Sequence, residues 1–270
     1  MLREMSGSRQ ALFQAVLDRP AEDTPRVLFA AFLHAQGDPY GTFIRAQLAR
    51  TQALRHGSDE EASRFEEEAR WIENEHRTTT WMNGIEKLVR LPWFIRGFVE
   101  KVVVDARQYL DHADELYRRA PIRHLVLSEV GDLVAEVARD PHLAQLVSLT
   151  LDNSTGKRPI GDAGLAAVAV SPHLRNLKTL GIPHQGIGAA GLEALCASKV
   201  LPSLIYINMV GNKFDDPIEG FGTDWATGRG EVNGTYLPPF GRELEARFGE
   251  LAWLHAPSRL RHFPPLAEEL

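Results

Sequence analysis

One short apolar phrase occurs three times in the second half of the chain and limits what the chain can fold into. Its spacing is L-x-x-L-x-x-L-x-L, with isoleucine or methionine at some of the later positions. The three copies start at Leu143, Leu174 and Leu201, which are 31 and 27 residues apart. A period of this length indicates one structural unit that is repeated along the chain.

A second block, with the pattern I-G-x-A-G-L, lies between the copies of this phrase. It starts at Ile160 and again at Ile187. Apolar residues then recur at helical spacing, whereas the last L-x-L of each phrase alternates as in a strand. Each unit is therefore predicted to be a strand, a turn, a helix and a second turn. Stacked units of this kind bury a continuous core between a parallel sheet and a layer of helices.

The phrase and its period resemble the leucine-rich repeat, and a period near 27 residues is similar to the ribonuclease-inhibitor type. The resemblance implies an α/β solenoid with parallel strands on the concave side and helices on the convex side. Two earlier segments match only the strand phrase and are predicted to be degenerate first repeats. Five strands are expected, near Val102, Leu125, Leu149, Leu180 and Ile207. The residues expected to be almost fully buried are Leu149, Leu151, Leu180 and Ile207.

Residues 8–56 are predicted to form helices. Asp23 and Thr24 precede Pro25, and a capping residue followed by proline in the first turn favours a helix start. Gly37-Asp38-Pro39 is expected to end that helix and to turn the chain into a third one.

This segment resembles the bacterial repeat-companion domain, a short helical module found before leucine-rich repeats. The family pattern is D-x-P-R-L-x-Y-A-D-W-L-x-x-x-G-D-P-x-G-E-F-I-R-x-Q, and residues 23–33 and 37–47 follow it. The chain departs from the pattern at Ala31, Phe32 and Thr42. The resemblance implies a small all-helical module in front of the repeats, and it implies no activity.

Three regions are therefore expected. They are a helical module with a charged helix at 1–80, the repeat solenoid at 81–213, and a loop and cap at 214–270. The acid-rich stretch 57–80 favours a solvated helix with a narrow apolar stripe, and an acidic docking surface is the alternative. Residues 215–239 favour a cap over the last repeat, and a functional loop between Pro217 and Pro239 is the alternative.

Charge and cysteine content narrow the function classes. The formal net charge is −6 and no basic run is present, which disfavours nucleic acid as a partner. Cys196 is the only cysteine, so a reducing compartment fits best. The first residues contain no apolar signal segment, and no apolar run approaches the ~18 residues of a membrane span. We expect a cytoplasmic protein that has no membrane partner.

The sequence contains no catalytic, phosphate-binding or metal-binding motif with a specific spacing. His142 and His173 recur at the same turn of successive repeats, which indicates turn structure more than metal ligation. Cys196 is expected to be a buried apolar residue. Asn153 and Asn212 follow strands and are expected to satisfy backbone groups of the turns. No cofactor, no metal site and no catalytic residue are predicted.

What remains is the surface formed by the outward positions of the strands, because solenoids use such a concave face for binding. The residues predicted to contact a partner are Lys101, His124, Val126, Ser148, Thr150, Asp152, Thr179, Tyr206 and Asn208. The sequence thus predicts a non-catalytic scaffold or adaptor that binds another protein. A structural subunit of a larger assembly is one alternative. A small enzyme with acids such as Asp224 and Glu231 in residues 217–239 is another.

Overall fold

The computed structural model describes residues 2–76, 78–209, 211–212 and 239–255. At 2–7, 239–242, 254 and 255 it describes the backbone alone. The chain forms two compact units. The first, here the N-terminal unit, comprises the residues up to Val103 together with His112–Arg123. The second, here the repeat unit, comprises Val104–Asp111 and the described residues from His124 to His255. The predicted loop 215–239, with Asp224 and Glu231, lies outside the described residues except for Pro239, so its two interpretations stay predictions.

Four helices begin the N-terminal unit: α1 (Leu2–Asp18), α2 (Thr24–His34), α3 (Pro39–Arg55) and α4 (Asp59–Glu75). The predicted helix start and turn are confirmed. Gly37 ends α2 with a φ of 71°, and the Asp38 carboxylate caps α3 by accepting from the Tyr40 N–H at 3.0 Å. α4 buries only Ala62, Ala69 and Ile72, which confirms a helix with a narrow apolar stripe, and an acidic docking surface on it stays a prediction.

Short 3-10 helices at Thr78–Met82 and Ile85–Lys87 lead to an antiparallel hairpin, which is followed by α5 (Ala106–Arg119). The hairpin consists of β1 (Leu91–Ile95) and β2 (Phe98–Asp105). Only β2 was predicted. Arg96 and Gly97 form the turn with φ values of 50° and 86°, as both central residues of a type I′ turn require. A Cβ on Gly97 would lie 2.6 Å from the Ile44 side chain, so the hairpin can approach α3 only with glycine there.

The core of the N-terminal unit is aromatic and includes residues from both the helices and the hairpin. The Phe98 ring of β2 packs against Phe13, Phe29 and Tyr40, at centroid distances of 5.7–6.1 Å. Trp81 stacks on Tyr40 at 4.8 Å. The expected domain boundary at residue 80 stays a prediction. The aromatic packing shows, however, that side chains from residues 81–98 share one core with α1–α3.

The chain contains a six-stranded, mostly parallel sheet in the order β1-β2-β3-β4-β5-β6, which is not closed. β3 (His124–Ser128), β4 (Ser148–Asp152), β5 (Thr179–Gly181) and β6 (Tyr206–Asn208) pair as parallel neighbours. The five predicted strand positions are therefore confirmed. In register, Leu125, Leu149, Leu180 and Ile207 form one row whose members are each at most 1% exposed.

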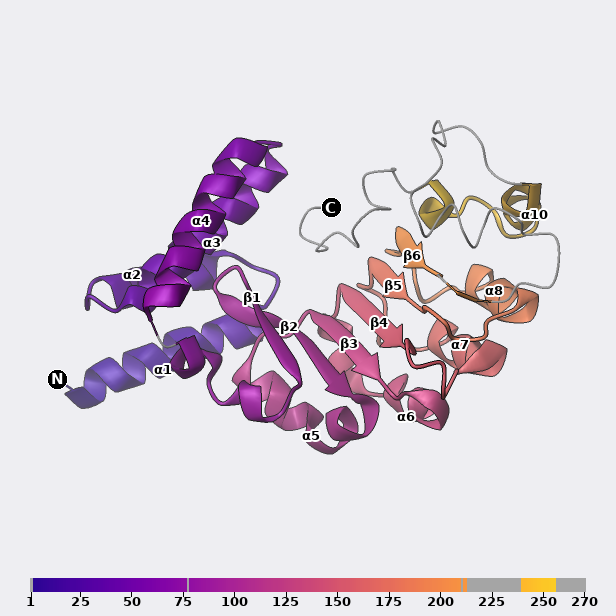
Figure 1. Cartoon of the computed structure of the whole chain (residues 1–270), viewed down its shortest axis with the longest axis horizontal. Helices are drawn as coiled ribbons and strands as arrows, with labels where there is room; N and C mark the ends of the chain where they lie inside the picture. The colour runs from indigo at the N-terminus through magenta and orange to yellow at the C-terminus, as the bar shows by residue number, and fades with distance from the viewer. Residues whose placement is uncertain (1, 77, 210, 213–238, 256–270) are drawn as a thin grey trace. The chain divides into compact units, whose positions relative to one another are not determined.

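The helices of the repeat unit follow the strands in turn: α6 (Val134–Val137), α7 (Gly161–Ala169) and α8 (Ala189–Cys196). They lie on one side of β3–β6 (Figure 1). The repeated I-G-x-A-G-L block thus becomes a helix in both copies, as predicted. A Cβ on Gly191 would lie 2.5 Å from the Asp162 carboxylate, so this glycine allows α8 to pack closely on α7.

The remaining short elements connect or follow these units. They are 3-10 helices at Gly131–Leu133, Pro141–Gln145 and Ala252–His255, and α10 (Pro239–Phe248). α10 lies in the region expected to form a loop and cap, and its Leu244 is fully buried.

Amide side chains satisfy the backbone of the turns that follow the strands, as predicted. Asn153 donates to the His184 carbonyl at 2.8 Å. Asn212 accepts from the N–H groups of Gln185 and Ile187, at 2.9 Å each, and donates to the Ile182 and Met209 carbonyls. Gln185, fully buried, donates to the Leu151 carbonyl at 2.6 Å. Each turn is thereby fixed to the turn of a neighbouring repeat.

Candidate partner-binding surface

The side of β3–β6 opposite to the leucine row is here called the strand face. Its register confirms that the predicted positions in the repeat unit are neighbours. His124, Ser148, Thr179 and Tyr206 form one row, and Val126, Thr150, Gly181 and Asn208 form the next. Asp152 follows at the end of β4, where its carboxylate accepts hydrogen bonds from the Ser154 hydroxyl and N–H.

Some residues of the strand face are buried and others are partly exposed, and the sequence did not predict this difference. His124 and Thr179 are each 3% exposed and Tyr206 is 7% exposed. The expectation that these three side chains are open to a partner is therefore wrong. Alternation along a strand assigns a residue to one face of the sheet, but it does not say whether that face is covered. Val126, Ser148, Thr150, Asp152 and Asn208 are partly exposed and remain candidates.

Lys101, the other predicted contact residue, belongs to the N-terminal unit and lies on the hairpin. Its ammonium lies 5.2 Å from the centre of the Trp93 ring, directly across the strand pair. Burial lowers the pKa of Lys101 from its usual 10.5. Leu91 lies opposite Val103 in the same hairpin, and Leu91 and Trp93 are 52% and 40% exposed. We call these four residues the hairpin face.

Sequence reasoning missed Leu91 and Trp93 because β1 was not predicted. A usable signal was present: the apolar run Leu91–Ile95 lies directly before the Arg96-Gly97 pair, and the predicted strand at Phe98 follows it. Two strand-like segments on either side of a two-residue turn with glycine indicate a hairpin.

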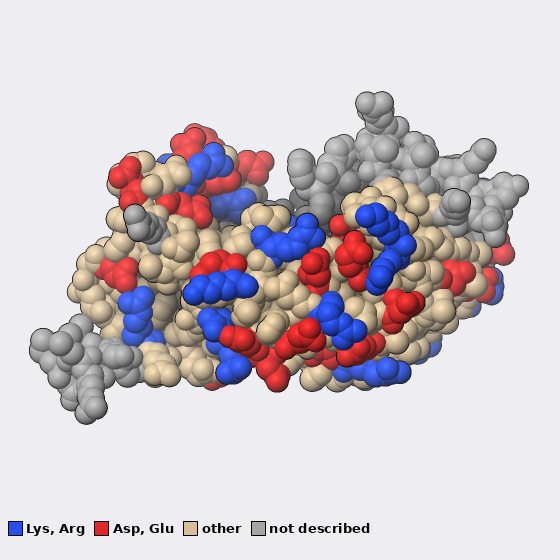
Figure 2. Space-filling model, turned by 60° about the horizontal axis from the view of Figure 1, so that its bottom comes forward, with Lys and Arg blue, Asp and Glu red and all other residues tan. Residues whose placement is uncertain are grey.

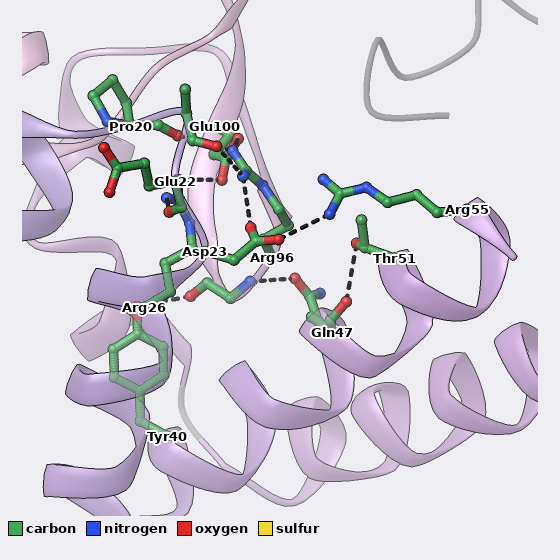
Figure 3. A network of polar contacts seen from close by, with 12 residues as sticks. Pro20, Glu22, Asp23, Arg26, Tyr40, Gln47, Thr51, Arg55, Arg96 and Glu100 are labelled. Atoms are coloured by element: carbon green, nitrogen blue, oxygen red, sulfur yellow. Dashed lines mark hydrogen bonds and ion pairs between the residues drawn. The ribbon is translucent and has the colours of Figure 1, made fainter. Parts of the chain in front are cut away.

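Buried charges connect the helices of the N-terminal unit to the hairpin (Figure 3). Glu100 on β2 accepts from Arg26 of α2 at 2.6 Å and from Arg96 of the turn at 2.8 Å. All three side chains are fully buried. Arg96 also donates to Asp23 at 2.8 Å and to the carbonyls of Pro20 and Ala21. We call this set the arginine network.

The arginine network explains the polar residues of the N-terminal motif. Asp23 precedes α2, but its side chain does not cap the helix and instead accepts from Arg55 and Arg96. Burial would raise the pKa of Asp23, but hydrogen bonds from Arg55 and Arg96 and their charges lower it below the usual 3.8. The Gln47 side chain accepts from the Gly97 N–H at 2.8 Å. The Tyr40 hydroxyl donates to the Gly97 carbonyl at 2.9 Å. The motif thus positions the hairpin.

The N-terminal unit also contains a pocket of about 400 Å³. Its walls include the rings of Phe13, Tyr40 and Trp81, and among the described side chains its polar lining includes Arg9 and Arg118 but no carboxylate. Such a lining favours a neutral or anionic occupant over a cation.

Other candidates for chemistry are weak among the described residues. These contain no group of three or more His, Cys, Asp or Glu side chains placed to hold a metal ion. His142 pairs with Asp140 at 2.8 Å in its turn. Cys196 is buried, and burial raises the pKa of its thiol to about 12. None of the helices described is both long enough and apolar enough to cross a membrane.

Charges of both signs are mixed on the molecular surface. On the face shown in Figure 2, Lys and Arg side chains are interspersed with Asp and Glu side chains. No continuous area of positive charge is visible on this face, and the formal net charge of the chain is −6.

Comparisons with known proteins identify no relative. No protein-family model, no curated protein and no solved structure matches the chain.

Proposed function

We propose that this protein is a non-catalytic scaffold or adaptor of the leucine-rich repeat class. Its repeat unit would be a solenoid of the ribonuclease-inhibitor type, preceded by a helical module similar to the bacterial repeat-companion domain. It would bind another protein through the exposed part of the strand face. We include a cytoplasmic location in this proposal, because the single cysteine is a buried thiol.

One observation carries the proposal. The same strand position recurs in register from β3 to β6, with leucine or isoleucine buried on one side at every step. On the other side, Val126 and the polar residues Ser148, Thr150 and Asn208 are partly exposed, whereas all three residues of β5 are buried. Stacked units with one continuous exposed strand surface are how solenoid proteins bind their partners.

The chemistry of the strand face favours a protein partner. The exposed residues include neither Lys nor Arg, which a phosphate backbone would require. Small polar and apolar side chains instead fit a polypeptide surface. The absence of a catalytic motif in the sequence agrees with binding as the function.

The test is a pull-down from the native cell with the purified full chain, followed by mass spectrometry. Thr150→Arg is the diagnostic variant, because Thr150 is partly exposed and lies between Val126 and Gly181 in register. A partner would have to desolvate the new cation, which costs several kcal/mol and lowers affinity by roughly a hundredfold.

The matched control is Ala190→Arg, an exposed position on α8. It is preferred to Glu193, which pairs with Arg247 at 2.7 Å. Both variants should melt within a few degrees of the wild type. If Thr150→Arg retains the partner and Ala190→Arg loses it, the partner binds the helical side and the proposed surface is wrong.

A further inference from the structure

The hairpin face combines apolar exposure with a cation on one side of two strands. Leu91 lies opposite Val103, and Trp93 lies opposite Lys101. Residues directly opposite each other in an antiparallel pair project from the same face of the sheet. Val102, which lies between Lys101 and Val103, points to the other side and is fully buried. The hairpin therefore has an apolar inner side and a second, exposed apolar side.

This second side exposes two large apolar side chains next to each other. Leu91 is 52% and Trp93 40% exposed. Tryptophan is enriched among the residues that contribute most of the energy of protein interfaces. An adjacent leucine and valine extend the apolar area around the indole ring. A partner that covers this area removes it from water.

Lys101 adds a charge to the apolar area. Its ammonium lies over the Trp93 ring, and none of the described residues offers it a carboxylate at ion-pair distance. The side chain is only partly exposed. A cation that has lost part of its water without gaining a counter-ion gains more from a new carboxylate than a fully solvated lysine does.

We propose that the hairpin face binds a segment of the partner protein in which an apolar side chain is adjacent to Asp or Glu. This inference rests on the proposed function and names the chemistry of the partner. A second copy of this chain fits less well, because a symmetric contact through the same face would bring two Lys101 ammonium groups together. Nucleic acid fits less well because the face carries a single cation.

The experiment selects peptides from a random displayed library of 12-residue sequences with the purified full chain. Enriched peptides should contain an apolar residue within a few positions of Asp or Glu. Binding of a synthetic consensus peptide is then measured by fluorescence anisotropy. Trp93→Ala and Lys101→Met should each weaken it about tenfold or more. Leu91→Ser is a second test of the apolar area in case Trp93→Ala melts early.

Trp71→Ala is the matched control, because Trp71 is also an exposed tryptophan, 63% exposed on α4. It should bind the peptide like the wild type. The charge pairing is tested by changing the peptide's acid to its amide. This change should weaken binding to the wild type and have little further effect on Lys101→Met, as a double-mutant cycle requires.

Three results would overturn the inference. One is a selection that enriches no acid-containing sequence. Another is a consensus peptide that binds Trp93→Ala and Leu91→Ser as well as the wild type. The third is a concentration-dependent dimer that Trp93→Ala dissociates, which would identify a second copy as the occupant. If any of these occurs while Thr150→Arg still loses the native partner, the proposed function stands and only the hairpin face is excluded.

Discussion

The two units of this protein bury different chemistry. In the N-terminal unit, Arg26, Arg96 and Glu100 are fully buried and meet at the junction between helices and hairpin. In the repeat unit, rows of leucine fill the interior, and amide side chains such as Asn212 and Gln185 hold the turns. The first arrangement depends on pairing between residues that are far apart in sequence. The second repeats one local arrangement with small variations.

This difference predicts which kind of substitution destabilises each unit most. A buried ion that loses its partner remains as an uncompensated charge, and neighbouring side chains cannot relax to remove it. A shortened leucine leaves a cavity that the surrounding side chains partly fill. The N-terminal unit should therefore be the more sensitive to a single change of charge, and the repeat unit to a change of volume.

The largest effect is expected from Glu100→Gln. Removing the carboxylate leaves the guanidinium groups of Arg26 and Arg96 buried around a neutral amide. We expect a loss of about 3–5 kcal/mol in the free energy of unfolding. Urea denaturation followed by far-UV circular dichroism measures it. Glu66→Gln is the control, because Glu66 pairs with Arg70 at the surface and should matter by about 1 kcal/mol or less. Similar losses for both variants would show that the buried position of the charges does not matter.

Leu180→Ala should have the next largest effect. Leu180 is fully buried and lies between Leu149 and Ile207 in register. Its truncation should cost about 2–5 kcal/mol through lost burial and a residual cavity. Ser148→Ala, on the other side of the neighbouring strand, is the control and should stay within about 0.5 kcal/mol. Urea midpoints decide the matter, and equal losses would mean that the faces of the strands are assigned in reverse.

The repeat unit was the more predictable of the two because its period repeats the same contacts. A leucine that follows the same turn in three copies has the same neighbours in each, so Leu149, Leu180 and Ile207 could be placed without a structure. The roles of Asn153 and Asn212 followed from the same reasoning. The exposure of the strand-face residues could not be predicted in this way. The sequence assigned Thr179 and Tyr206 to the strand face correctly, but nothing in a strand pattern indicates that they are covered.

The N-terminal unit was predictable only at the level of its helices. Capping residues and turns are local signals, and α2 and α3 start where those signals are. Arg26 and Glu100 are 74 residues apart, and no local pattern connects them. The hairpin was missed because Arg96-Gly97 is not one of the dipeptides that most strongly indicate a type I′ turn. Of the candidate contact residues, Lys101 was found from β2, whereas Leu91 and Trp93 needed β1.

Asn212→Ala tests the amide contacts of the repeat unit and should have a smaller effect. Its amide oxygen accepts from two backbone N–H groups, and its nitrogen donates to two carbonyls. Leaving these groups without a partner should cost about 1–3 kcal/mol. The control is Asn176→Ala, because Asn176 is exposed and makes one bond, to the Ala144 carbonyl at 2.9 Å. If the two alanine variants melt alike, water replaces the Asn212 amide and the turns are not held by it.

The smallest effect is expected at Asp23, where the arginine network meets solvent. The side chain of Asp23 is 35% exposed, so its contribution to stability is screened by water. Because Arg55 and Arg96 lower its pKa in the folded state, folding favours the charged carboxylate. The resulting stabilisation is present above the pKa of the unfolded state, about 3.9. It is lost as the pH falls through the folded-state pKa.

Asp23→Asn should therefore be less stable than the wild type at pH 7, and the difference between them should shrink below about pH 4. Urea midpoints at several pH values between 7 and 3 measure this convergence. Arg55→Gln removes one of the two donors to the carboxylate and should weaken the pH dependence without abolishing it, because the buried Arg96 still donates at 2.8 Å. If the difference between Asp23→Asn and the wild type were independent of pH, Asp23 would act by its shape and hydrogen bonds alone. The charged part of the network would then be confined to Arg26, Arg96 and Glu100, whose side chains are fully buried and which the Glu100→Gln variant tests separately.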